Sequence, residues 1–310
     1  MTKHPEVTTR RTILKYGAGI TVASALPSIP AFGASTILKR AIPNTGEMLP
    51  IVGIGTSRIF DVEDNTPEWQ ERRGVLQNLF DGGGTVVDTA PSYQDAENVI
   101  GKLLTQMGAR NRAFVATKVW ADGREEGREQ IENSFKRLRT NKIDLFQVHN
   151  LSDTDTQMDI LRGLKKEGHI RYVGITHFRA GYNRELAAAL HRHKPDFVQL
   201  GYSLNQLSTE TELLPIAKDL GIAVIVNRPY GRGSMFRNVR GRALPDWAQE
   251  FGANSWGQFF LKYILGHPTV TCVIPGTDKV KYMLDNLGAG RGALPDAAMR
   301  KRMVKYWESL

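Results

Sequence analysis

Short apolar runs alternate with longer amphipathic segments along most of the chain. The apolar runs occupy residues 52–55, 85–88, 114–118, 145–148, 172–175, 197–200, 223–226 and 271–274. Runs of this length with polar flanks are typical of buried parallel strands. Between them, apolar residues recur three or four positions apart, as Ile131, Phe135 and Leu138 do, which indicates helices with one buried face. Eight strands that alternate with helices predict an α/β protein whose parallel sheet closes into a (β/α)8 TIM barrel.

Further elements are predicted at the two ends of this pattern. Residues 37–49 contain the turn sequence PNTG at 43–46 between two extended pieces, which predicts a hairpin. Gly168 and Gly221 each precede a predicted strand, where a left-handed glycine would end a helix. Residues 295–310 predict a C-terminal helix. Its apolar face consists of Met299, Met303 and Tyr306. Such a face is typical of packing, with a role in a substrate pocket as the alternative.

The stretch GTVVDTAPSY at residues 84–93 is the most informative for chemistry. Asp88 ends a predicted strand, and Tyr93 follows in a loop of small residues. Lys118 ends the next predicted strand, and His149 follows the one after it. The carboxyl ends of barrel strands meet at one face, so we expect these four side chains to converge. An acid, a phenol, an amine and an imidazole in one place suit proton transfer.

Each of these four residues also has a structural interpretation. Asp88 would serve as a helix N-cap and Tyr93 as a loop aromatic. Lys118 would be a surface lysine and His149 a hydrogen-bonded core histidine. Their joint occurrence at matching strand ends favours catalysis over four separate structural roles.

Several segments, taken in order, resemble the aldo/keto reductase superfamily between residue 48 and about residue 290. The matching segments are DTAPSY, ATK, DLFQVHN, HIRYVGITHF, FVQLGYSLNQ and VIPGTDKVKYMLDNL. The resemblance implies a (β/α)8 barrel with a hairpin across its floor. It also implies an enzyme that uses NADPH to reduce aldehydes or ketones, or that runs the reverse oxidation.

The four strand-end residues can be given roles in such a reduction. A free phenol, with a pKa of about 10, is a poor proton donor at neutral pH. An ammonium beside it makes proton release easier, and a carboxylate keeps that ammonium charged and in position. We therefore expect Tyr93 to be the general acid, Lys118 to tune its pKa and Asp88 to hold Lys118. His149 would orient and polarise the substrate oxygen.

The Gly-rich fingerprint of doubly wound dinucleotide-binding folds is absent, so the cofactor site has to be read mainly from the second half of the chain, where the resemblance implies its residues. Gly55 and Thr56, at the first barrel strand, would lie beneath the cofactor. Thr176, His177 and Gln199 would face the nicotinamide carboxamide, although the family more often has Ser-Asn at the first two positions.

The loop after the seventh predicted strand is expected along the pyrophosphate. Its residues are Asn227, Arg228, Pro229, Tyr230 and Gly231. Asn227 stands where the family commonly has an aromatic residue that stacks on the nicotinamide. Gly231 permits close backbone approach, and Arg228 or Arg232 would supply positive charge.

The adenosine end is expected in the last matching segment, where a helix amino terminus offers N–H groups to phosphate. The residues implied are Gly276, Thr277, Lys281, Asp285 and Asn286. Tyr282 stands where many NADPH-specific members have arginine, so Lys279 or Lys281 would meet the 2′-phosphate as point charges. NADPH is the expected cofactor and NADH the alternative. Trp120 and Tyr202 are expected near the substrate, with packing as their alternative role.

The first 33 residues differ in character from the rest of the chain. TRRTILK, at residues 9–15, resembles a twin-arginine export signal. A weakly apolar, Gly- and Ala-rich stretch follows, and small residues near Gly33 suit cleavage. We expect residues 1–33 to be a signal peptide and residues 34–310 to be the barrel domain. A disordered basic tail or an uncleaved anchor remains the alternative.

This interpretation predicts the twin-arginine export machinery as a partner and the periplasm as the location. At about fourteen residues, and broken by Pro27 and Pro30, the weakly apolar stretch is short for a membrane span, so no stable membrane anchor is expected.

Composition narrows the remaining possibilities. The 310 residues carry a formal net charge of +9, and residues 1–33 contribute three of these charges, which leaves +6 for the rest. The basic residues are spread along the chain without a binding motif, so we expect no nucleic-acid partner. Cys272 is the single cysteine and has apolar neighbours, which predicts a buried, inert thiol. No cluster has convincing metal-ligand spacing.

Two other functions compete with carbonyl reduction. One is a non-catalytic member of the same family that binds the nicotinamide cofactor for sensing or assembly. The other is an unrelated barrel enzyme such as a lyase or hydrolase. The presence of all four chemical residues weighs against the first, and the lack of metal spacing or a nucleophile elbow weighs against the second.

Overall fold

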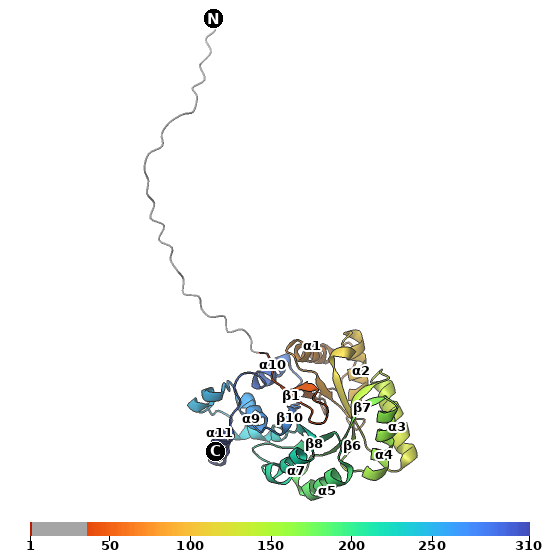
Figure 1. The fold of residues 1–310 in the computed structure, drawn as a ribbon. Helices are drawn as coiled ribbons and strands as arrows, with labels where there is room; N and C mark the ends of the chain where they lie inside the picture. Colours follow the sequence, from red (N-terminus) through yellow and green to blue (C-terminus); the bar gives the residue numbers. More distant parts are fainter. Residues whose placement is uncertain (2–35) are drawn as a thin grey trace. The chain divides into compact units, whose positions relative to one another are not determined.

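Eight parallel strands form one sheet in the order β10-β9-β8-β7-β6-β5-β4-β3 (Figure 1). The strands are β3 (Ile54–Gly55), β4 (Val86–Asp88), β5 (Phe114–Val119), β6 (Ile143–His149), β7 (Ile170–His177), β8 (Phe197–Gly201), β9 (Ala223–Asn227) and β10 (Val270–Val273). A parallel bridge between Val52 and Val273 joins the two edges of the sheet, and Gly53 N–H donates to the Val273 carbonyl at 2.9 Å. The predicted (β/α)8 barrel is confirmed, and each predicted strand has its counterpart.

This computed structural model describes residue 1 and residues 36–310. The segment that resembles a twin-arginine signal lies outside the described residues. Residues 35–310 form one compact unit by themselves.

Helices follow the strands and cover the outside of the sheet. They are α1 (Pro67–Asp81), α2 (Ala96–Gln106), α3 (Arg124–Arg137), α4 (Thr154–Lys166), α5 (Asn183–His193), α6 (Ser208–Glu212), α7 (Leu214–Asp219), α8 (Ser234–Asn238), α9 (Trp256–Leu265), α10 (Val280–Ala289) and α11 (Ala297–Glu308). Short 3₁₀ turns lie at Arg110–Arg112, Ala180–Tyr182, Gly231–Gly233 and Asp246–Phe251. Side-chain caps begin three of the helices: Thr66 for α1, Ser255 for α9 and Asp296 for α11.

Apolar side chains form one cluster inside the barrel and another between sheet and helices. Strand residues alternate between the two, as adjacent Val86 and Val87 do. Cys272 lies in the inner cluster, fully buried. Burial raises the pKa of its thiol, so the predicted inert thiol fits its surroundings.

The predicted hairpin is confirmed as β1 (Lys39–Ala41) and β2 (Met48–Pro50), paired antiparallel. Ile42 and Leu49 are buried in the inner cluster, which places the hairpin across the floor of the barrel. Arg40 anchors it, because its guanidinium donates to the backbone carbonyls of His267, Val270 and Leu265.

The predicted C-terminal helix is confirmed as α11, and its face packs against the barrel. Met303 is fully buried. Arg300 donates to Glu210 and to the Tyr202 hydroxyl, each at 2.5 Å, and Trp307 donates to Asn205 at 2.9 Å. Gly168 and Gly221 have the expected left-handed backbone, with φ of 83° and 65°.

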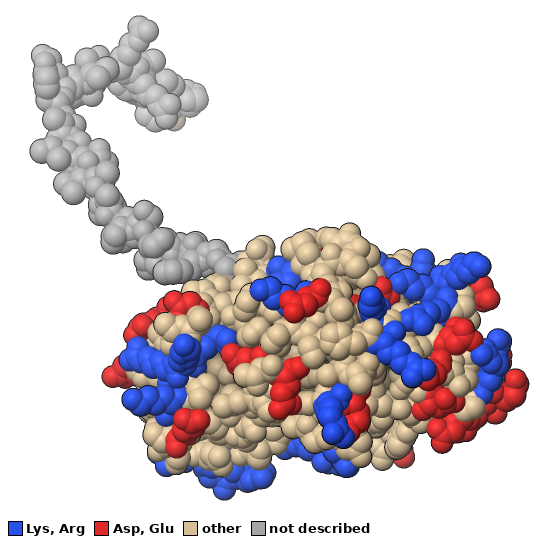
Figure 2. Space-filling view, turned by 60° about the horizontal axis from the view of Figure 1, so that its bottom comes forward, with Lys and Arg blue, Asp and Glu red and all other residues tan. Residues whose placement is uncertain are grey.

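Lys and Arg side chains are interspersed with Asp and Glu over the face shown in Figure 2. In residues 36–310, no helix has the length and apolar character that crossing a membrane requires.

Candidate active site

The carboxyl ends of the strands surround a cavity of about 560 Å³. Asp88, at the end of β4, and His149, at the end of β6, both line it. Tyr93 lines it from the loop after β4, and Trp120 from the loop after β5. Lys118 lies directly behind, fully buried in β5. The fold thus brings together the four residues predicted to be catalytic, Asp88, Tyr93, Lys118 and His149, which span 61 positions in the sequence.

Asp88 and Lys118 form a buried ion pair. The Lys118 ammonium donates to both carboxylate oxygens of Asp88 and to the Thr89 carbonyl, each at 2.8 Å. These three bonds use all three of its donors. Burial alone would lower the pKa of Lys118, but the negative charge of Asp88 and its hydrogen bonds to Lys118 outweigh burial, so the pKa is raised. Lys118 therefore remains an ammonium at neutral pH.

Tyr93 lies against this ion pair, and the Lys118 ammonium is 5.0 Å from the centre of its ring. Burial raises the pKa of Tyr93, and the positive charge of Lys118 offsets this only in part. The sequence led us to expect that Lys118 makes the phenol more acidic than a free phenol. In the structure the pKa of Tyr93 is higher than that of a free phenol. Lys118 instead limits the rise that burial causes, and the phenol keeps its proton at neutral pH.

His149 lies beside Tyr93, with ring centres 6.1 Å apart and planes at 85°. Its ring centre is also 5.6 Å from that of Trp120. Burial, followed by the positive charge of Lys118, lowers the pKa of His149 to about 3. The imidazole is therefore neutral at neutral pH. A neutral imidazole carries one N–H, so it can donate a hydrogen bond without being an acid.

Hydrogen bonds from amide side chains connect Asp88 to other residues around the cavity. Gln199 donates to Asp88 at 2.6 Å, and its carbonyl oxygen accepts from Thr176 at 3.4 Å and from Asn227 at 3.3 Å. Gln147 donates to Asp88 at 3.4 Å. The acid that holds Lys118 is thus also connected to residues expected to face a cofactor.

Many of the residues expected at a cofactor line the same cavity. They are Gly55, Thr56, Thr176, Gln199, Asn227, Arg228, Pro229, Tyr230 and Gly276. Two of their polar atoms, Thr56 Oγ1 and Asn227 Oδ1, are buried and make no hydrogen bond within the described residues. Asn286 lies behind Tyr230 and accepts its hydroxyl at 2.5 Å. Gly231, next to Tyr230, has a φ of 55° that favours glycine.

Other predicted residues lie outside the cavity wall. The His177 ring packs on Tyr182, with centres 4.1 Å apart, and its Nδ1 accepts from the Arg179 backbone. Lys281 is exposed, with its ammonium 4.9 Å from the Tyr282 ring centre.

Thr277 and Asp285 also lie away from the wall. Thr277 is buried and donates to the Lys279 carbonyl at 3.4 Å. Asp285 accepts from Ser255 and Gln258. Of the two residues expected near the substrate, Trp120 lines the cavity, whereas Tyr202 is packed beneath α11.

Several residues that line the cavity were not found by sequence reasoning. They are Ser57, Arg58, Ile59, Ser92, Asn150 and Phe178. Arg58 and Asn150 each follow the end of a strand closely, and this position was the feature of the sequence that could have indicated them. Gln147 is two residues before His149 and so shares its face of β6, which the two-residue period of a strand could have revealed.

Comparison with known proteins agrees with this geometry. The sequence pattern described as the Aldo/keto reductase family matches residues 51–302. The chain belongs to the aldo/keto reductase family. It is therefore an oxidoreductase.

Individual relatives cover most of this aldo/keto reductase. It is 30% identical to the aldo-keto reductase str7 of Strobilurus tenacellus, over 81% of this chain and 85% of the relative. It is 27% identical to the aldo-keto reductase yakc [NADP(+)] of Schizosaccharomyces pombe, over 86% and 90%. Among solved structures, an aldo/keto reductase from Klebsiella pneumoniae in complex with NADP and acetate matches with a TM-score of 0.72. That match has 25% identity and covers 86% of this chain and 96% of the other.

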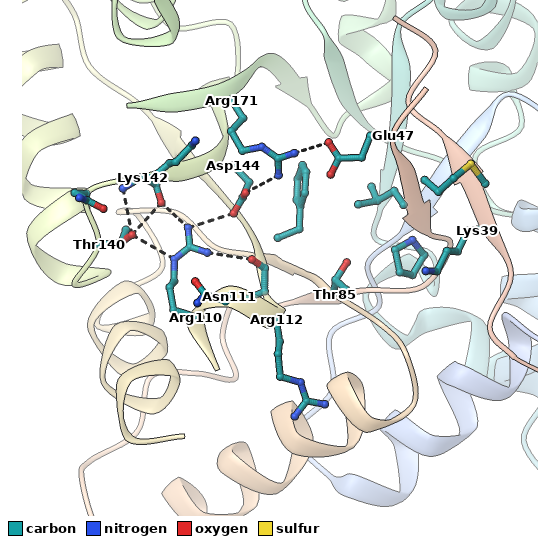
Figure 3. Close-up of a pocket in the computed structure, with 16 residues that line it drawn as sticks. Lys39, Glu47, Thr85, Arg110, Asn111, Arg112, Thr140, Lys142, Asp144 and Arg171 are labelled. Carbon is teal, nitrogen blue, oxygen red and sulfur yellow. Dashed lines mark hydrogen bonds and ion pairs between the residues drawn. The ribbon is translucent and has the colours of Figure 1, made fainter. Parts of the chain in front are cut away.

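This aldo/keto reductase has a second hollow, of about 540 Å³, at the amino ends of the strands. In Figure 3, the side chains of Arg110, Asp144, Arg171 and Glu47 are directed toward one another. Asp144 accepts from Arg171 at 2.9 Å and from Arg110 at 3.2 Å, and Arg171 also pairs with Glu47. Arg110, Asp144, Arg171 and Glu47 thus form a network of ion pairs at this end of the barrel. In the described part of the chain, no group of three or more metal-ligating side chains is present.

Proposed function

We propose that this protein reduces the carbonyl group of small aldehydes or ketones to an alcohol with NADPH, and that Tyr93 supplies the proton. The observation that carries the proposal is the meeting of Tyr93, His149 and the buried Asp88–Lys118 pair in one cavity. Membership of an oxidoreductase family supports it, as does the NADP named for relatives and neighbours.

The residues of the wall fit a nicotinamide dinucleotide. Thr56 Oγ1 and Asn227 Oδ1 are buried polar atoms available to a ligand. A side chain at Gly276 would approach the Gly55 carbonyl to 3.3 Å, so glycine keeps the space between these loops open. NADPH, when bound, supplies the hydride that the carbonyl carbon receives. Arg232 and the glycine-rich backbone around it would hold its pyrophosphate, and Lys279 or Lys281 its 2′-phosphate.

The protein's own residues handle the proton. Neutral His149 donates a hydrogen bond to the carbonyl oxygen and orients it. The Tyr93 hydroxyl transfers its proton to that oxygen as negative charge develops there. The Lys118 ammonium, fixed by Asp88, stabilises the phenolate that remains. A residue in each role is present, and each acts from a rigid strand end or the loop beside it.

Replacement of the proposed acid tests the function directly. We expect Tyr93→Phe to lower the rate of aldehyde reduction by about 10²- to 10⁴-fold, the usual contribution of a general acid. Binding titrations with NADPH and NADH should give unchanged dissociation constants for this variant and tighter binding of NADPH. Tyr306→Phe, which removes a phenol outside the cavity, is the matched control. Full activity of Tyr93→Phe would refute the assignment.

The same experiment separates the competing function. A cofactor-binding sensor or assembly protein would bind NADPH in the titration, yet it would consume none when a reactive aldehyde is added. Loss of NADPH absorbance in the wild type, dependent on both aldehyde and Tyr93, supports the reductase.

We also propose that residues 1–33 direct the folded protein to the periplasm through twin-arginine export. The pattern TRRTILK and the weakly apolar stretch after it support this. We expect the double change Arg10→Lys and Arg11→Lys to retain the protein in the cytoplasm on cell fractionation, whereas Lys15→Arg should leave export intact. Equal periplasmic recovery of both variants would contradict the proposal.

A further inference from the structure

Arg228 places a positive charge in the wall of the cavity that contains Tyr93 and His149. It follows β9 directly and lines the cavity together with Tyr93. Its guanidinium carbon lies 3.3 Å from the ring centre of Phe178, which lines the same cavity. The residue is partly buried. Among the ion pairs formed by the described residues, none includes Arg228.

Other arginines increase the positive charge around it. Arg58 and Arg232 line the cavity, and the guanidinium of Arg179 lies 5.3 Å from the Phe178 ring centre. None of these three is paired with an acid within residues 36–310. Burial, followed by repulsion from Arg232, Arg179 and Arg58, lowers the pKa of Arg228 to about 10.

The acid within the cavity does not balance this charge. Asp88 is the only acidic side chain among the described residues of the cavity wall, and Lys118 occupies both its oxygens. A partly desolvated guanidinium with cationic neighbours is unfavourable unless an anion joins it. The wall is therefore complementary to an oxyanion, and Arg is the side chain best suited to bind one by two parallel hydrogen bonds.

Two oxyanions could meet these arginines under the proposed function: a phosphate of the cofactor or an acidic group of the substrate. Arg228 is placed close to the ion pair that holds the proton donor. It directly follows Asn227, whose side-chain amide donates to Gln199, and Gln199 in turn donates to Asp88. Arg228 therefore leaves β9 at the end of the cavity that contains Asp88, whereas Arg232 lies four residues further along the loop. In agreement with this position, burial raises the pKa of the Tyr93 phenol and the positive charge of Arg228 offsets part of this rise.

We propose that the preferred substrates are carbonyl compounds that carry a carboxylate or another oxyanion, and that Arg228 binds this group. The inference rests on the proposed reductase function and adds the substrate class to it. The carbonyl oxygen lies at Tyr93 and His149 while the acidic group pairs with Arg228, stacked on Phe178. Neutral carbonyl compounds lack this second contact and bind more weakly.

An aldehyde that carries a carboxylate and its uncharged methyl ester together test the substrate class. With saturating NADPH, we expect kcat/KM to be about tenfold or more higher for 4-carboxybenzaldehyde than for its methyl ester. In Arg228→Gln, the ratio of the two kcat/KM values should fall toward one. Arg228→Lys should retain part of the preference for the carboxylate. Arg184→Gln, which removes an exposed arginine outside the cavity wall that pairs with Glu185, should keep the wild-type preference.

Binding without turnover provides a second readout. In calorimetric titrations of the NADP⁺-loaded protein, benzoate should bind more tightly than benzamide, and Arg228→Gln should remove the difference. If benzoate binds in this manner but neither aldehyde is reduced, the proposed reaction fails while the oxyanion site stands.

Other results would overturn the inference. One is equal kcat/KM for the two aldehydes in the wild type, with no preference for benzoate. Another is a loss in Arg228→Gln that is the same for both aldehydes and is matched by weaker NADPH binding. In that case Arg228 serves the phosphates of the cofactor, and the reductase function remains.

Discussion

His149 and Tyr93 lie in one cavity, and burial moves their pKa values in opposite directions. It lowers the pKa of His149 to about 3 and raises that of Tyr93. Both shifts have the same cause, because a low-dielectric environment disfavours the charged form of any group. At neutral pH the imidazole is therefore uncharged and the phenol protonated, the states in which one orients a carbonyl oxygen and the other gives it a proton.

The depressed pKa of His149 predicts a pH-dependent stability. Below the unfolded-state pKa of about 6.5, the unfolded chain binds a proton that the folded chain does not. The contribution of His149 to the free energy of unfolding is fully present above pH 6.5 and is lost progressively as the pH falls toward 3. Urea unfolding at pH 7 and pH 5 should show that the wild type loses about 2 kcal/mol more than His149→Gln. The exposed His191, changed to Gln, is the control. Identical losses in all three proteins would contradict the prediction.

Helices position the strand ends through close contacts, as α2 and α3 show. Glu97 of α2 accepts a buried hydrogen bond of 2.6 Å from Thr117, the residue before Lys118. α2 reaches α3 where Gly101 has no side chain, because a Cβ there would collide with the Arg137 carbonyl and lie 2.9 Å from Leu138 Cα. Glycine is thus required where the two helices meet, one turn beyond the residue that holds β5.

Gly101→Ala should destabilise the protein by about 1–3 kcal/mol, the usual cost of overpacking, because backbone atoms block the added methyl group. Gly163→Ala in α4 is the matched control. Its Cβ would meet nothing within 4 Å, so we expect a gain of about 0.4–1 kcal/mol. Urea denaturation of both variants measures the difference. Equal stability of the two would show that α2 can move away from α3 at little cost.

The candidate active site and the main ion-pair network of the barrel lie at opposite ends of its axis. The cavity with Tyr93 lies at the carboxyl ends of the strands, and the paired charges around Asp144 lie at their amino ends. Loops after the strands can therefore change without disturbing the floor, as expected for barrels of this type.

Asp144→Asn should lower Tm without changing the dissociation constant for NADPH. The carboxylate accepts from the Val115 backbone at 2.9 Å and from two arginines. Its loss leaves their charges less balanced, at a cost of about 1–3 kcal/mol after allowance for the partial exposure of the arginines. Thermal unfolding and a cofactor titration measure the two effects. Asp159→Asn breaks an exposed pair with Arg124 and should leave Tm unchanged. Weaker NADPH binding by Asp144→Asn would argue against the separation.

The sequence predicted the barrel and much of the candidate site. The residues of the cavity that it did not predict share one feature. Asp88, Lys118 and His149 could be found because strand ends are visible in the local pattern. Arg58 and Phe178 also follow strand ends closely, but their loops have no periodicity that shows which way a side chain points, so the sequence did not single them out. His177 is adjacent to Thr176 in β7, but alternation along a strand sends neighbouring side chains to opposite faces.

The sequence by itself determined the elements: the apolar runs of the strands, the amphipathic helices, the floor hairpin, the C-terminal helix and the residues at strand ends. These depend on neighbours a few positions apart, which local patterns record. Only the tertiary structure decided which side chains share a cavity, that His149 is neutral and that Arg228 lines the cavity of Tyr93 without an ion-pair partner among the described residues. Burial and charge proximity arise between residues far apart in the chain, and they exist only once the barrel has closed.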